Sequence, residues 1–176
     1  MTLSVSGAAL HTGLTMIALA LLLIGACRDI ASRIIPDWVS VVLAVTGLAG
    51  RAFSGVGAIA ASVALAAGLF LVLLALHARG GLGGGDVKLM SATALGLPVA
   101  GACQFLLATA IAGAGLAVVH LVARRLPRPA CCPVTASRMR RLWTVEKWRW
   151  RREGCIPYGV AIACGGAWVM LPGLGT

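Results

Sequence analysis

Acidic side chains are scarce in this sequence, which has only five Asp and Glu among 176 residues. Fifteen Lys and Arg residues leave a formal net charge of +10. Hydrophobic residues make up 60% of the chain, above the half or so that is usual in a water-soluble domain. The mean hydropathy of +0.96 points the same way. Together these values exclude an ordinary soluble domain and indicate a membrane protein.

No CxxC pair occurs among the six cysteines. Zinc ribbons and thioredoxin-like motifs need that spacing, so we predict no structural metal. Basic residues are also missing before the first apolar run, although "LLLIGAC" ending at Cys27 looks like a lipoprotein cleavage box. Because signal peptides normally open with a basic segment, we interpret residues 8–27 as a retained helix.

Apolar segments recur along the whole chain, most of them near the roughly 20 residues that cross a hydrocarbon core. They predict an all-α, polytopic membrane protein, with a bundle of six transmembrane helices in a single domain over residues 1–176. The predicted spans are residues 8–27, 37–53, 56–77, 87–97, 101–122 and 156–172.

Basic residues fall almost entirely on one side of these spans. Ten of the fifteen lie in the loop 123–155, and only Arg51 lies in a loop on the opposite side. Because Lys and Arg favour cytoplasmic loops, we predict an N-out orientation with loop 123–155 in the cytoplasm. This loop interleaves Trp with Arg, a composition suited to anionic membrane lipids. Nucleic acid is the rival partner, but no recognition motif supports it, and we predict none.

Three aspartates, Asp29, Asp37 and Asp86, lie at the predicted cytoplasmic ends of spans. A carboxylate at mid-bilayer costs about 2.5 to 3.5 kcal/mol on insertion scales, so one kept at membrane depth is a functional candidate. Asp37 follows Pro36 at a predicted helix start, where an acid stabilises the helix dipole, and we predict it to be a structural cap. Asp29 instead ends an apolar run, where the dipole disfavours an anion, so a functional role explains it better.

Asp86 follows the glycine-rich segment "GGLGGGD" at 80–86, and two interpretations of this segment remain open. In the first, the glycines form a re-entrant loop at membrane depth, against which a substrate peptide can lie. In the second, the segment is a flexible turn that ends at an acidic helix N-cap.

Three motifs carry a family resemblance. "GGGD" at 83–86 satisfies the GxGD signature of intramembrane aspartic proteases, and "DIASRIIPD" at 29–37 resembles the DxxxRxIP[ND] segment of the type IV prepilin peptidases. "IPYGVAI" at 156–162 is similar to the opening of the last span in the same family. The chain resembles the short branch associated with Flp or tight-adherence pili, which lacks the cytoplasmic methyltransferase region and its two CxxC pairs.

This resemblance implies a hydrolase of the bacterial inner membrane: an aspartic endopeptidase that removes the leader peptide of Flp-type prepilins at the cytoplasmic face. Its substrate would carry a short hydrophilic leader ending in Gly before an apolar helix, and pseudopilins are a second substrate class. The resemblance assigns Asp29 and Asp86 as the catalytic pair and places Asp37 where family members often have Asn. Further candidates for substrate binding or loop shaping are Gly83, Gly84, Gly85, Arg33 and Lys88. For Arg33 and Lys88 a role facing the lipid headgroups is the alternative, and the topology rule favours it.

Two carboxyl groups that meet share a proton, so one can act as a base on water while the other protonates or polarises the scissile carbonyl. The sequence does not assign these two roles. This two-carboxylate chemistry needs neither a metal nor an organic cofactor, and we predict none. Two other functions remain open. One is a non-enzymatic membrane scaffold of a pilus or secretion assembly, in which the aspartates only cap helices. The other is a proton-coupled carrier, since paired intramembrane carboxylates also build proton relays.

Overall fold

The computed structural model describes residues 2–125 and 157–171, and every regular element in these ranges is an α-helix. This confirms the predicted all-α bundle of six helices for the described part of the chain. The basic loop predicted at 123–155 lies almost entirely outside the described residues. The helices are α1 (Thr2–Ser32), α2 (Asp37–Ala52), α3 (Val56–Ala78), α4 (Gly84–Leu95), α5 (Val99–Arg125) and α7 (Tyr158–Met170).

Three of the described helices contain segments long and apolar enough to cross a membrane, namely Ala9–Ser32, Val56–Ala78 and Val99–Val122. The other three helices are shorter. The 12 residues of α4 form a helix about 18 Å long at 1.5 Å per residue, whereas the hydrocarbon core is about 30 Å thick. α4 begins at Gly84, three residues earlier than the span predicted from residue 87, because Gly84 and Gly85 are helical.

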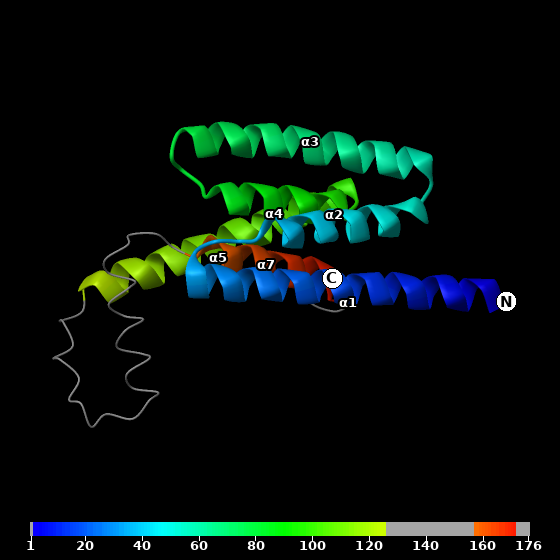
Figure 1. Ribbon diagram of the computed structural model, residues 1–176, viewed down its shortest axis with the longest axis horizontal. Helices are drawn as coiled ribbons and strands as arrows, with labels where there is room; N and C mark the ends of the chain where they lie inside the picture. The colour runs from blue at the N-terminus through cyan, green and yellow to red at the C-terminus, as the bar shows by residue number, and fades with distance from the viewer. Residues whose placement is uncertain (1, 126–156, 172–176) are drawn as a thin grey trace, which may run out of the picture. The chain divides into compact units, whose positions relative to one another are not determined.

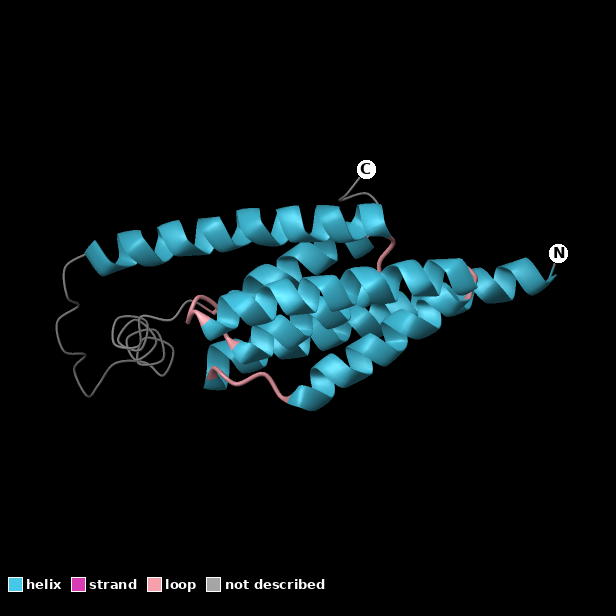
Figure 2. Cartoon of the chain, turned by 90° about the horizontal axis from the view of Figure 1, so that it is seen from above, coloured by secondary structure: helices cyan, strands magenta, loops and turns pink. Residues whose placement is uncertain are grey.

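The chain divides into two compact units, one formed by Met1–Ala112 with Pro157–Thr176 and the other by Gly113–Ile156. All the predicted site residues lie in the first unit. Within it, α1, α2, α3 and α4 alternate in direction, and α2, α3 and α7 pack around α4 (Figure 1). α1 packs against α2 and α7. Figure 2 shows the short loops that join consecutive helices from α1 to α5.

The core of the first unit lies around α4. Seven of its twelve residues are buried, and Leu89 and Ala94 have no exposed surface at all. Small residues on and beside α4 permit this close packing. A Cβ atom at Gly47 of α2 would lie only 2.7 Å from the Cα of Gly96, which directly follows α4. The short central helix is therefore held on several sides.

Candidate active site

Asp29 is held near the end of α1 by the start of α7. Its side chain is buried, and its Oδ2 atom accepts a hydrogen bond of 2.8 Å from the backbone N–H of Gly159. Gly159 is the second residue of α7, where backbone N–H groups have no partner within their own helix. A helix N-terminus favours negative charge, so α7 stabilises the carboxylate that the end of α1 disfavours.

No side chain fits at Gly159. A Cβ atom there would lie 2.9 Å from the Cβ of Asp29 and 3.0 Å from its Oδ2. The segment "IPYGVAI" at 156–162, which carries one of the three family motifs, therefore also has a local structural explanation. Pro157 is the N-cap residue of α7, and the glycine two positions later brings its N–H group against Asp29. The sequence signal that could have predicted this contact is a glycine in the first helical turn after a proline.

Asp86 is the third residue of α4, and the N-cap position belongs to Gly83. The Gly83 N–H donates a hydrogen bond back to the Asp86 carboxylate, as the acidic residue of a capping box does. The Oδ1 atom of Asp86 is buried and has no hydrogen-bond partner within the described residues. A buried polar atom without a partner is unfavourable and calls for an explanation. Helix capping therefore accounts for the position of one oxygen of this carboxylate. It does not account for the burial of Oδ1, which favours a functional role for that atom.

The two aspartates come together because α1 and α4 touch one helical turn away from both. A Cβ atom at Gly25 of α1 would lie 3.3 Å from a methyl group of Leu89 on α4. Asp29 lies one turn after Gly25 and Asp86 one turn before Leu89. α1 and α4 run in opposite directions, so both steps lead toward the same end of the unit (Figure 1). The charge of Asp29 accordingly acts on the carboxylate of Asp86.

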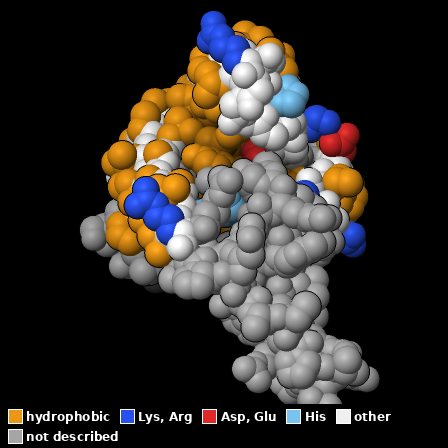
Figure 3. Space-filling view, turned by 90° about the vertical axis from the view of Figure 1, so that its left-hand side faces the viewer, with side chains coloured by type: hydrophobic (Ala, Val, Ile, Leu, Met, Phe, Trp, Pro, Cys, Tyr) orange, Lys and Arg blue, Asp and Glu red, His pale blue; other side chains and the backbone are white. Residues whose placement is uncertain are grey.

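This end of the first unit also carries other charged groups (Figure 3). Basic and acidic side chains are visible there between large apolar ones. No group of three or more His, Cys, Asp or Glu side chains with the geometry of a metal site occurs in residues 2–125 and 157–171.

The glycine-rich segment before Asp86 is divided between a loop and a helix. Gly80 has a positive φ of 76°, which only glycine adopts without strain, whereas Gly84 and Gly85 form the first turn of α4. A Cβ atom at Gly85 would lie 3.1 Å from the Cβ of Ile35, in the loop between α1 and α2. The loop after Asp29 and the helix that carries Asp86 are therefore in direct contact.

His77, near the end of α3, also holds this segment. Its Nδ1 atom lies 2.7 Å from the backbone oxygen of Leu82, so this nitrogen carries the proton of the hydrogen bond. Its Cε1 atom is 3.4 Å from the position that a Cβ at Gly84 would take. The end of α3 is thereby tied to the loop that leads into Asp86.

Asp37 and Lys88 form an exposed ion pair. The Oδ1 and Nζ atoms are 2.7 Å apart, and the side chains are 71% and 49% exposed. Asp37 is the first residue of α2, after Pro36 at the N-cap position. Exposed pairs of this kind contribute about 0 to 1 kcal/mol, so the pair adds little to the stability of the bundle.

Arg33 has the only left-handed backbone among the non-glycine residues that the structure describes, with φ at 57°. Its backbone N–H donates to the carbonyl of Asp29 at 3.0 Å, and its charge acts on the Asp29 side chain. A left-handed conformation costs an L-residue roughly 1–2 kcal/mol, whereas glycine adopts it readily. Arg33 therefore stands beside Asp29 in a strained conformation.

Arg33→Gly is expected to raise the free energy of unfolding by about 1 kcal/mol, because glycine removes this backbone strain. Thermal or denaturant unfolding of the purified protein in detergent measures the change. Arg28→Gly is the matched control, since a glycine inside α1 should lower stability by about 1 kcal/mol. A loss of stability in Arg33→Gly would mean that the contacts of the guanidinium group outweigh the strain.

The chain matches the type IV leader peptidase family over residues 16–118, more than half of its length. The matched range contains Asp29 and Asp86, the loop between α1 and α2, and the glycine-rich segment, and it ends before α7. No curated protein and no solved structure matches the chain. With three apolar helices that can cross a bilayer, this membrane protein belongs to the type IV leader peptidase family.

Proposed function

We propose that the protein is an aspartic endopeptidase that removes the leader peptide of Flp-type prepilins, with Asp29 and Asp86 as its catalytic pair. Membership of a family of leader peptidases makes it a protease. The observation that carries the aspartic mechanism is the meeting of these two carboxylates from α1 and α4. Asp29 is buried, and Asp86 keeps a buried oxygen without a partner in the described part of the chain.

The expected chemistry follows from this pairing. Two neighbouring carboxyl groups in a poorly solvated site do not readily both ionise, so they hold one proton between them. The ionised group takes a proton from a water molecule, whose oxygen attacks the scissile carbonyl carbon. The protonated group donates its proton to the carbonyl oxygen, and collapse of the tetrahedral intermediate breaks the C–N bond as the leaving amine takes up a proton.

The partners of each carboxylate suggest where the water lies. The Gly159 N–H donates to Oδ2 of Asp29, and the Gly83 N–H donates to the Asp86 carboxylate. The remaining oxygens are Oδ1 of Asp29 and the unpartnered Oδ1 of Asp86. A water between these two oxygens could exchange protons with either carboxyl group, so the pair is expected to titrate as a unit.

The proposal places the protein in the bacterial inner membrane, N-out, with the aspartates at the cytoplasmic face. Asp29 lies near the C-terminal end of the candidate span Ala9–Ser32. Arg28, Arg33 and Arg79 lie at this same end of the bundle, and such residues favour the cytoplasmic side. The hydrophilic leader of a prepilin could then reach the site from the cytoplasm while its apolar helix remains in lipid. Pseudopilins would present the same chemistry, and the basic loop 123–155 would contact anionic lipids.

Co-expression with a Flp-type precursor, in a bacterial host without its own prepilin peptidase, tests this function. Wild-type protein should shorten the precursor on a gel, and mass spectrometry of the product should show a new N-terminus directly after the leader. Asp37→Asn should process the precursor within about twofold of wild type, because it removes only an exposed ion pair. A scaffold or a carrier would leave the precursor uncut.

A further inference from the structure

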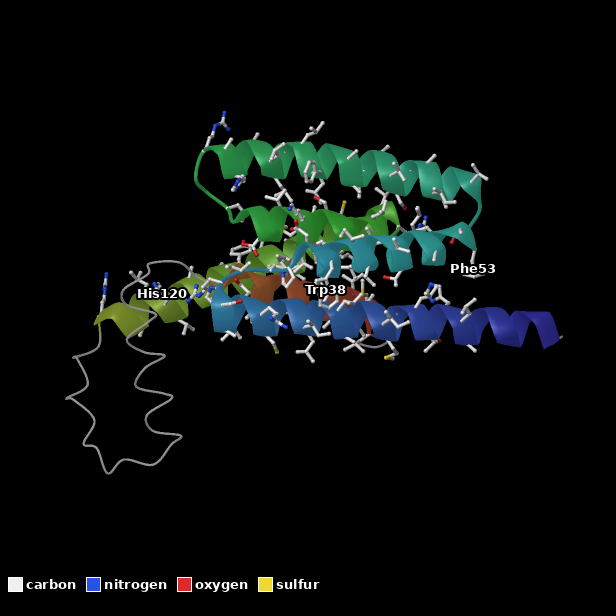
Figure 4. The ribbon with its side chains drawn as sticks, viewed as in Figure 1. Trp38, Phe53 and His120 are labelled. Carbon is white, nitrogen blue, oxygen red and sulfur yellow. The ribbon has the colours of Figure 1, made fainter. Side chains whose placement is uncertain are left out.

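A cavity of about 660 Å³ lies at the end of the first unit opposite to the two aspartates. It is lined by the first half of α1, the end of α2, the connection between α4 and α5, and the end of α7. His11, at this cavity, and Asp29 are separated by roughly 27 Å of α1 at 1.5 Å per residue. Phe53, which follows α2, marks the same end in Figure 4. The cavity is therefore separate from the candidate active site.

Arg51 supplies a fixed positive charge at this cavity. Its Nε atom donates a 3.0 Å hydrogen bond to the hydroxyl of Ser62, which is buried and donates in turn to the carbonyl of Leu97 at 3.2 Å. The terminal amino groups of the guanidinium have no partner within residues 2–125 and 157–171. A guanidinium held in this way, with the edge formed by its two terminal amino groups available, suits bidentate binding of a phosphate or carboxylate.

The start of α5 adds to the positive potential. Pro98, Ala100 and Gly101 line the cavity, and α5 begins at Val99. The N–H groups in the first turn of a helix lack partners within the helix and carry a partial positive charge, which makes a helix N-terminus an anion site. His11 and Gln104 bring further polar groups to the same lining. Among the described residues that line the cavity there is no Asp or Glu, so no charged group of theirs would balance a cationic ligand.

Much of the remaining lining is apolar. Leu14 and Ala18 come from α1, Leu43 from α2, and Val169 and Met170 from α7. The α1 residues lie within a candidate membrane span, and Gly101 and Gln104 lie within another. The cavity thus joins an anion-binding end to an apolar wall at the depth of the lipid. A free anion would use only the first of these features, whereas a lipid with a charged head would use both.

We propose that this cavity binds an anionic membrane phospholipid. The phosphate group would contact Arg51 and the first turn of α5, and an acyl chain would lie along the apolar wall formed by α1, α2 and α7. The lack of acidic side chains among the described lining residues favours an anionic headgroup over a zwitterionic one, whose ammonium group would find no partner among them. The bound lipid would tie the start of α5 to the end of α2.

The test uses the full-length protein purified in a neutral detergent. Phosphatidylglycerol, phosphatidylcholine with the same acyl chains, and inorganic phosphate are titrated separately, and the thermal unfolding midpoint is followed. Phosphatidylglycerol should raise the midpoint in a saturable way, as a ligand of the folded state does. An equal rise with phosphatidylcholine would overturn the role of the headgroup charge. An equal rise with inorganic phosphate would overturn the choice of a lipid.

Two variants locate the site. Arg51→Gln should lower the affinity for phosphatidylglycerol at least about tenfold, because it removes charge-assisted hydrogen bonds to the phosphate. The titration of the midpoint should then require at least about ten times more lipid. Ala100→Glu leaves the Arg51–Ser62 pair intact and places an acid in a first helical turn, which favours folding but repels the phosphate. Its midpoint without lipid should be no lower than the wild-type value, while the response to phosphatidylglycerol is lost. Arg79→Gln, at the opposite end of the bundle, is the matched control and should respond as wild type does. An undiminished response in Ala100→Glu would overturn the proposed site.

Discussion

Replacing either Asp29 or Asp86 with Asn is expected to slow removal of the prepilin leader roughly 10³-fold or more, the scale of a lost general acid or base. Asn has nearly the same size, and its amide oxygen can still accept the hydrogen bond that Gly159 gives to Asp29. What it cannot do is exchange a proton with water. The loss would therefore fall on the chemical step, with the position of the side chain retained.

Cleavage of a purified precursor under single-turnover conditions measures this loss, and circular dichroism checks that the variants remain helical. Because the two carboxyl groups act as a unit, the double variant should be no slower than either single one. Asp37→Asn provides the matched control, since that aspartate is exposed and paired with Lys88. A single variant at Asp29 or Asp86 that still cleaves at the wild-type rate would exclude that aspartate from the catalytic pair.

The helices and the positions of the aspartates at helix ends could be predicted because both depend on local sequence. Apolar runs set the helices, and Pro36 and the glycines interrupt them. The start of α4 was misplaced by three residues because glycine is a poor helix former. Packing against Ile35 and His77 holds Gly85 and Gly84 in that first turn, and such contacts between distant segments override the local preference.

The partners of the charged groups were harder to predict because each comes from another helix. The sequence marked Asp29 as poorly placed at the end of α1, but the group that stabilises it belongs to α7. Arg51 was visible as the one basic residue on its side of the predicted spans, but its hydroxyl partner, Ser62, lies on α3. Hydrogen bonds across long sequence separations leave no periodic pattern in the chain, so only the packed bundle reveals them.

The second large loss of cleavage rate is expected from a substitution at the contact between α7 and Asp29. Gly159→Ala should lower the cleavage rate about 10²-fold, the scale expected when a reacting group is displaced by about 1 Å. The added Cβ would lie 2.9 Å from the Cβ of Asp29, so either Asp29 or the start of α7 must move. Gly159 does not itself exchange protons, and its substitution should therefore lower kcat with little change in KM.

Gly68→Ala on α3 is the matched control for this variant, because a Cβ there meets no atom within 4 Å. It should cleave at the wild-type rate and gain slightly in stability, since alanine favours a helix over glycine by about 1 kcal/mol. Comparing the thermal midpoints of the two variants separates displacement of Asp29 from general unfolding. If Gly159→Ala kept the full cleavage rate, the hydrogen bond from α7 would serve only the stability of α1, and the position of Asp29 for catalysis would have to depend on α4 and the loop at Ile35.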